Sequence, residues 1–187
     1  MSRLALTALV VLPLLGGCAG ASSRSAGTPP GRAFAGVWVP SPPEVITAML
    51  ALAEVAPTDV VYDLGSGEGE IVIEAARRYG VRAVGVELDA ERIENAAKNA
   101  AAAGVQDRVT FIEGDLFEID IGEATVVTLY LFPELMERLL PKLLRELRPG
   151  TRIVSHDFRL PDWPPETTIE VPLDRIRRVH LWTIPRR

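Results

Sequence analysis

The feature that most limits the possible folds is a glycine-rich loop between a short apolar run and a helical pattern. The run VVYDL (residues 60–64) is rich in β-branched and aromatic residues, as buried strands are. Gly65, Gly67 and Gly69 follow at alternate positions, and a helix is predicted over residues 70–79. A strand, a glycine loop and a helix in this order predict the first unit of a layered α/β sheet.

The rest of the chain repeats this alternation of strands and helices. A preceding helical pattern, EVITAMLALAEVA, is expected to end at Pro57. Later strands are predicted from VRAVGVE, VTFIEGD, ATVVTLYL and TRIVSHDF, and later helices from AERIENAAKNAAAAG, capped by Asp89, and PELMERLLPKLLRELRPG, in which Pro141 should cause a kink. Two strands without a helix between them, TTIEVPL and RRVHLWTI, end the pattern. The prediction is an α/β fold with a doubly wound, mostly parallel sheet and an antiparallel edge strand.

The N-terminal residues have the composition of an export or anchor segment. Residues 1–18 contain one early cation, an apolar run too short to span a membrane as a mature helix, and the sequence LGGC, which resembles the lipobox of bacterial lipoproteins. Cys18 would then carry a lipid; an uncleaved anchor or a misassigned start is the alternative. Residues 19–36 read as a flexible linker and residues 37–187 as one domain. We expect a membrane-associated bacterial lipoprotein, with the side of the membrane left open.

The charge balance argues against nucleic acid as a partner. Acidic residues outnumber basic residues by 25 to 20, so the chain lacks a general electrostatic attraction for a polyanion. The C-terminal RIRRVHLWTIPRR is locally basic, and we interpret it as a solvated edge strand whose charges block further pairing. No metal site is expected.

The spacing of the glycines distinguishes between kinds of ligand site. In an open α/β sheet the ligand lies beyond the carboxyl ends of the strands, where the strand order reverses. A dinucleotide fingerprint would require glycine at position 70, where Glu70 stands, and a P-loop would require Gly-Lys-Ser/Thr. A nucleoside site without a phosphate and a tight turn without a ligand remain.

The pattern Asp63-x-Gly65-x-Gly67-x-Gly69 after a strand resembles the cofactor loop of class I S-adenosylmethionine-dependent methyltransferases. The resemblance implies their seven-stranded Rossmann-like fold and S-adenosyl-L-methionine as the cofactor. Glycines without Cβ atoms would let the backbone, including Ser66, approach the sulfonium and amino-acid portion of that molecule.

Three acidic residues follow predicted strands at the binding edge. Asp63 suits the positively charged amine of the cofactor, and Glu87 can accept both ribose hydroxyls. Asp115 takes the position that commonly contacts the adenine amino group in these enzymes, or else it forms a turn after Gly114.

The resemblance extends to one narrower group. The stretches VPSP, YLFPEL and SHDF are similar to the group that includes the mitochondrial protein-lysine methyltransferases of ATP synthase c subunit and adenine nucleotide translocase, over roughly residues 37–184. It implies a protein-lysine acceptor and a membrane attachment through the N-terminal segment. It also implies that Trp38, Pro40 and Ser41 form part of a lid over the cofactor, with packing of the arm before the domain as the alternative for these three residues. A small-molecule O/N-methyltransferase with the same cofactor half is one alternative. A lipid-anchored protein that binds the cofactor without catalysis is another, because S-adenosylmethionine is made in the cytoplasm and an exported domain would meet little of it.

The acceptor side has fewer distinctive residues. Tyr130 and Phe132 follow the fourth predicted strand, where methyltransferases flank the transferable methyl, and aromatic faces attract cations. His156 and Asp157 follow the fifth strand and could act as a base and its orienting partner, or could be ordinary strand-end residues. Glu134 reads as a first-turn helix residue.

Overall fold

The computed structural model describes residues 39–186. The predicted export segment (1–18) with Cys18, the linker (19–36) and Trp38 therefore lie outside the described residues. Within residues 39–186, no helix has both the length and the apolar character needed to cross a membrane.

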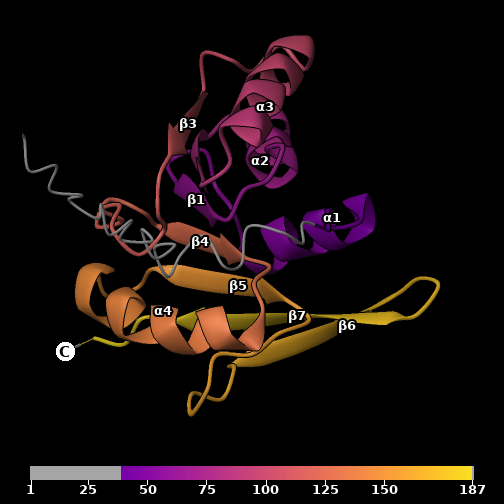
Figure 1. The fold of residues 1–187 in the computed structure, drawn as a ribbon. Coiled ribbons are helices and arrows are strands. Elements are labelled where there is room, and N and C mark those ends of the chain that lie inside the picture. Colours follow the sequence, from indigo (N-terminus) through magenta and orange to yellow (C-terminus); the bar gives the residue numbers. More distant parts are fainter. Residues whose placement is uncertain (1–38, 187) are drawn as a thin grey trace, which may run out of the picture.

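Seven strands form one sheet in the order β3-β2-β1-β4-β5-β7-β6 (Figure 1). The strands are β1 (Val60–Leu64), β2 (Arg82–Glu87), β3 (Val109–Glu113), β4 (Val126–Leu129), β5 (Arg152–His156), β6 (Thr167–Pro172) and β7 (Ile176–Thr183), and the helices are α1 (Pro43–Leu52), α2 (Glu70–Tyr79), α3 (Ala90–Ala102) and α4 (Pro133–Glu146). Strands β1 to β5 run parallel, β7 is antiparallel to β5, and β6 is antiparallel to β7. The predicted doubly wound sheet with an antiparallel edge is confirmed.

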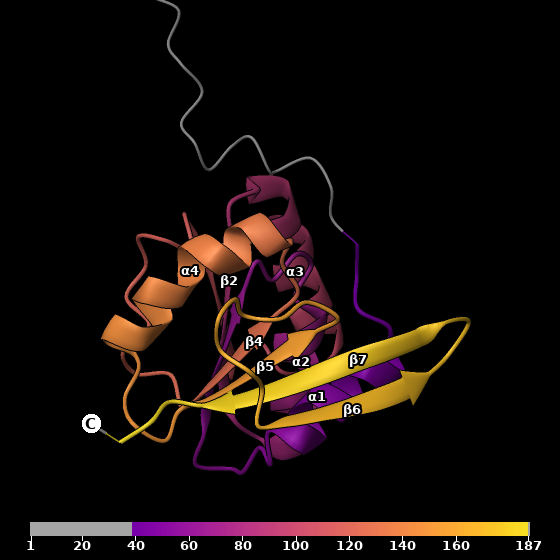
Figure 2. The same ribbon diagram turned by 90° about the horizontal axis from the view of Figure 1, so that it is seen from below.

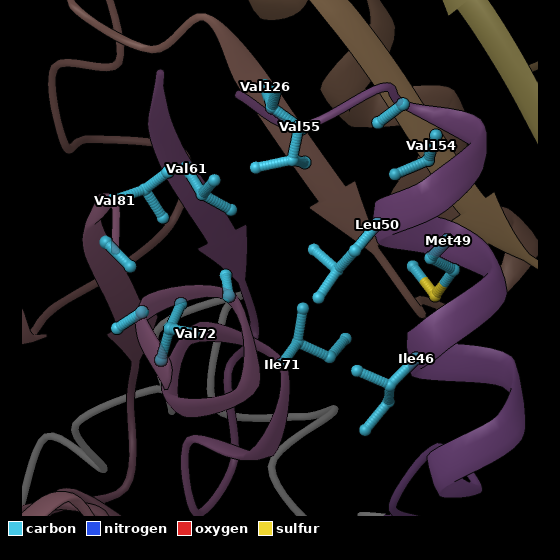
Figure 3. Packing of buried hydrophobic residues seen from close by; sticks show 14 of the residues in the cluster. Ile46, Met49, Leu50, Val55, Val61, Ile71, Val72, Val81, Val126 and Val154 are labelled. Carbon is cyan, nitrogen blue, oxygen red and sulfur yellow. The ribbon is translucent and has the colours of Figure 1, made fainter. Parts of the chain in front are cut away.

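Helices cover both faces of this sheet. Figure 2 shows α4 on one side of β4 and β5 and the helices α1, α2 and α3 on the other. Alternate strand residues point to opposite faces, so Val61 of β1 packs with α1 and α2, whereas Leu64 packs on the side of Met136 from α4. Figure 3 shows Met49 and Leu50 of α1 directed toward the first of these clusters. Full burial of a side chain the size of Met49 or Leu50 contributes about 1.5–3 kcal/mol to the free energy of folding.

The first helix ends earlier than predicted. Helix α1 stops at Leu52, before Pro57, and Glu54 takes a left-handed conformation with a φ of 49°. The guanidinium of Arg152 donates to the backbone oxygens of Ala53 (2.6 Å) and Glu54 (3.0 Å). A partner almost one hundred residues away thus binds carbonyls at the helix end, which the local sequence does not reveal.

The basic C-terminal strand is not at the edge, so that interpretation was wrong. Strand β7 lies between β5 and β6, and β6 forms the edge. Val179 and Trp182 of β7 are fully buried, as expected for a strand that pairs with a neighbour on each side.

Pro141, where the sequence predicted a kink, lies inside α4, which is continuous from Pro133 to Glu146.

The strand order places the candidate site. The chain runs from β1 outward to β2 and β3, then returns to the other side of β1 to form β4. The order therefore reverses between β1 and β4, and in such sheets the crevice beyond their carboxyl ends receives ligands. The glycine loop follows β1 at this point.

Candidate functional site

A cavity of about 190 Å³ lies at the carboxyl ends of the central strands. Every loop at this edge contributes to its wall. The contributions come from the arm before α1 (Val39, Pro40, Ser41), the loop after β1 (Gly65, Ser66) with Asp63, the end of β2 (Glu87, Leu88), the turn after β3 (Asp115, Leu116, Phe117), the residues after β4 (Tyr130, Leu131, Phe132) and Phe158 after β5. The site predicted at the strand-order reversal is thus a real cavity.

Gly65 and Gly69 of the glycine loop leave room for different neighbours. All three loop glycines have positive φ, at 85° for Gly65, 54° for Gly67 and 87° for Gly69, a conformation that strains other residues. Only Gly65 lies in the cavity wall, where a Cβ would come within 2.9 Å of Leu131 Cδ2. A Cβ at Gly69 would instead lie 2.7 Å from the ring of Phe111. Gly65 gives room beside the ligand space, whereas Gly69 gives room to the protein's own core.

Asp63 is a buried carboxylate at the floor of the cavity. Its side chain accepts a hydrogen bond of 2.7 Å from the hydroxyl of Thr128, its register neighbour on β4, and the residue is 3% exposed. Burial raises the pKa of Asp63 from 3.8 to about 7, against the effect of the Thr128 hydrogen bond and with the help of the negative charges of Glu70 and Glu87. A cation in the cavity would stabilise the ionised form.

Glu87 is fixed by the backbone around it. Its Oε2 accepts from the N–H of Gly67 (3.0 Å), and its Oε1 accepts from the N–H groups of Leu88 (2.8 Å) and Asp89 (3.1 Å). A carboxylate has about four acceptor positions, so the two oxygens keep roughly one for a ligand in the cavity.

Asp115 and Ser66 complete the polar wall. Asp115 Oδ1 accepts from the N–H of Phe117 at 3.0 Å, so the turn interpretation is confirmed, and the residue also lines the cavity. Ser66 also lines the cavity, but its hydroxyl is buried without a hydrogen-bond partner among the described residues. A Cβ at Gly85 would lie 2.7 Å from this oxygen, so the hydroxyl packs against β2.

Aromatic side chains form another part of the wall. Tyr130 and Phe132 line the cavity, where the sequence placed them, and Phe158 joins them with ring centroids 6.0 Å from Tyr130 and 6.1 Å from Phe132. Sequence reasoning missed Phe158. Its position directly after SHD, at the end of a parallel strand, was the available signal.

His156 and Asp157 lie behind the wall and do not line the cavity. The ring of His156 is fully buried and stacks on Tyr130 with centroids 3.9 Å apart, and burial lowers its pKa to about 4. Asp157, with a φ of 59°, accepts from the N–H of Arg178 and from the guanidinium of Arg175. Neither reaches the cavity as a base; Glu134, in the first turn of α4, is also outside its wall.

The charge of the cavity favours a cation. Its wall carries the acids Asp63, Glu70, Glu87 and Asp115, and one basic residue, Arg92. The aromatic faces add a further attraction for positive charge. In residues 39–186 no cluster of three His, Cys, Asp or Glu side chains could hold a metal ion. The buried carboxylates of Asp63 and Glu87 and the Cβ-free wall at Gly65 fit the amine, ribose and sulfonium portions of S-adenosylmethionine.

Comparisons with known proteins agree with this fit. The model of the ANTKMT methyltransferase domain matches residues 63–167. A protein-lysine N-methyltransferase of Saccharolobus islandicus is 48% identical over 135 residues, which are 72% of this chain and 84% of that protein. The adenine nucleotide translocase lysine N-methyltransferase of Mus musculus is 36% identical over 129 residues, and this chain spans 56% of its length.

A solved structure extends the likeness to the bound cofactor product. The crystal structure of an RNA methyltransferase from Salinibacter ruber in complex with S-adenosyl-L-homocysteine shares 53% identity. It superposes with a TM-score of 0.76 over 80% of this chain and 95% of the other. The two relatives at about half identity are thus named for different acceptors, a protein lysine and RNA.

Proposed function

This chain belongs to the ANTKMT methyltransferase domain family and is an S-adenosylmethionine-dependent methyltransferase, and we propose that it methylates the side-chain amine of a protein lysine. The observation that supports the lysine proposal is the aromatic wall of Tyr130, Phe132 and Phe158 beside the residues assigned to the cofactor, because aromatic faces attract a cationic amine. Two relatives that are 48% and 36% identical are named for lysine methylation.

The cofactor would be held by residues from three neighbouring strand ends. We assign Asp63 to the amine. The negative charges of Glu70 and Glu87 disfavour the ionised form of this buried carboxyl, and a bound cation would stabilise it. Glu87, with roughly one acceptor position left, receives one ribose hydroxyl rather than the two expected from the sequence, and the turn of Asp115 to Phe117 receives the adenine. When bound, the cofactor supplies an electrophilic methyl group on a sulfonium.

The aromatic wall would prepare the acceptor amine. A lysine must be neutral to displace the methyl group, and removal from water lowers the pKa of a lysine. Tyr130, Phe132 and Phe158 offer apolar faces that exclude water while still attracting a cation before it loses its proton. Alignment in this wall supplies much of the rate of a direct displacement.

The experiment that tests this function follows the labelled methyl group. The full-length chain is incubated with methyl-labelled S-adenosylmethionine and a cell extract that retains its membranes. We expect label in protein, recovered as methyl-lysine after hydrolysis, and its loss with Asp63→Ala. Label that RNase removes would replace the lysine proposal by the RNA acceptor of the Salinibacter relative. Label confined to low-mass products would establish a small-molecule acceptor, and no transfer with intact binding would leave a cofactor-binding protein without catalysis.

Attachment to a membrane through residues 1–18 is a separate proposal. It rests on the apolar run and the LGGC sequence alone, both outside the described residues. Cys18→Ala should release the protein from the membrane fraction if the cysteine carries a lipid. Unchanged fractionation of this variant would refute lipidation.

A further inference from the structure

The arm before α1 forms part of the cavity wall but has little to hold it. Residues 39–41 line the cavity, and Val39 is 53% exposed. Among residues 39–186, the arm makes one hydrogen bond, of 2.9 Å between Ser41 Oγ and His156 Nδ1. The two residues are 115 positions apart in the sequence, and both are buried.

His156 also contacts a second residue of the same cavity wall. Its ring stacks on Tyr130 with a centroid distance of 3.9 Å and an interplanar angle of 24°. Tyr130 and Ser41 both line the cavity, and His156 does not. One buried ring therefore joins two parts of the wall, one on the arm and one after β4.

The chemistry of the ring suits a structural link. Burial lowers the pKa of His156 to about 4, so the imidazole is neutral at physiological pH and has one N–H and one acceptor nitrogen. Its Nε2 is buried without a hydrogen-bond partner among the described residues, 3.5 Å from Asp157 Oδ2. A serine hydroxyl can donate to a bare Nδ1 or accept from a protonated one, so the bond to Ser41 forms with either tautomer of the neutral ring.

We propose that His156 is a positioning residue that holds the arm of residues 39–41 against Tyr130 and so keeps the cavity closed around the cofactor. This Ser41–His156 latch rests on the cofactor part of the proposed function and is independent of the acceptor. The role differs from that of a catalytic base, since His156 acts through the two wall residues it contacts.

The test compares two serine or threonine hydroxyls that bond a histidine Nδ1. Ser41→Ala should weaken binding of S-adenosylhomocysteine to the full-length protein by about fivefold, the value of one hydrogen bond. Cleavage by chymotrypsin at the bond between Trp38 and Val39 should accelerate by a similar factor. Ser41→Thr keeps the hydroxyl and should restore both measurements. The matched control is Thr168→Val, which removes the 2.8 Å bond from Thr168 to His180 Nδ1 away from the cavity.

A substitution of His156 tests the same contact from its other side. His156→Phe retains a ring beside Tyr130 and removes Nδ1, so adding Ser41→Ala to it should weaken binding no further. Binding by Ser41→Ala that equals the wild type, or an equal loss in Thr168→Val, would overturn the latch. Absence of binding by the wild-type protein would instead refute the cofactor site itself.

Discussion

Replacing Asp63 by asparagine should stabilise the protein and weaken cofactor binding at the same time. Burial raises the pKa of this carboxyl from 3.8 to about 7, so between these values the folded protein holds a proton that the unfolded chain has released. Stability therefore falls as the pH rises through this window, and the full penalty is present above pH 7. Asp63→Asn removes the ionisation and with it the penalty.

The structure sets the size of both effects. A change of pKa from 3.8 to about 7 corresponds to about 4 kcal/mol of folding free energy above pH 7. The asparagine oxygen can still accept the Thr128 hydroxyl, but its buried amide N–H groups cost about 1–3 kcal/mol if unpaired. We expect a net gain of about 1–3 kcal/mol at pH 8. Loss of a charge-assisted hydrogen bond should weaken S-adenosylhomocysteine binding by about 10- to 150-fold.

Urea unfolding and calorimetry measure the two effects. The stability advantage of Asp63→Asn should shrink by about 2–3 kcal/mol from pH 8 to pH 5, because the wild-type carboxyl becomes neutral. Asp157→Asn is the matched control with the opposite sign. Burial opposes the charge of Asp157, but the hydrogen bond from the Arg178 N–H and the charge of Arg175 lower its pKa, so this variant should lose stability at pH 8.

Two results would refute the reasoning about Asp63. If Asp63→Asn gained nothing at pH 8 relative to pH 5, the carboxylate would not be a buried, uncompensated charge. If binding of S-adenosylhomocysteine were unchanged, the amine would lie elsewhere.

Three other measurements follow from the same cavity. Affinity for S-adenosylhomocysteine should rise from pH 6 to pH 8 as Asp63 ionises, and a flat calorimetric profile would contradict its pairing with the amine. Gly65→Ala should weaken binding at least about tenfold, because a Cβ would lie 2.9 Å from Leu131 Cδ2, whereas Gly80→Ala, at a φ of 69° with free space around it, should lower stability by about 1–2 kcal/mol and leave affinity intact. Phe158→Ala should raise the KM for a lysine acceptor by about 3- to 30-fold, and an unchanged KM in steady-state assays would remove this ring from the acceptor site.

The bounds of α2 and α3 were predictable because residues next to the helix ends determine where these helices begin or stop. Helix α2 spans Glu70–Tyr79 and ends at Gly80, which adopts the left-handed conformation that glycine permits. Helix α3 begins after Asp89, whose carboxylate accepts from the Glu91 N–H. The sequence also placed Asp63, Glu87 and Asp115 at one edge of the sheet, because parallel strands all end there, and all three line the cavity.

Long-range contacts decided the features that the sequence did not reveal. The guanidinium of Arg152 reaches the end of α1, and the burial of Trp182 places β7 inside the sheet. The direction of the His156 side chain depends on packing against Tyr130 and Ser41, residues distant in sequence. A strand-end histidine was visible in the sequence, but its separation from the cavity was not.

A crystal structure of the protein with S-adenosyl-L-homocysteine would show whether Asp63 and Glu87 bind the cofactor. We expect the ligand beyond β1, β2 and β4, with its amine within hydrogen-bonding distance of Asp63 and a ribose hydroxyl on Glu87. A ligand bound elsewhere, or bound in this cavity without contact to either carboxylate, would contradict this expectation.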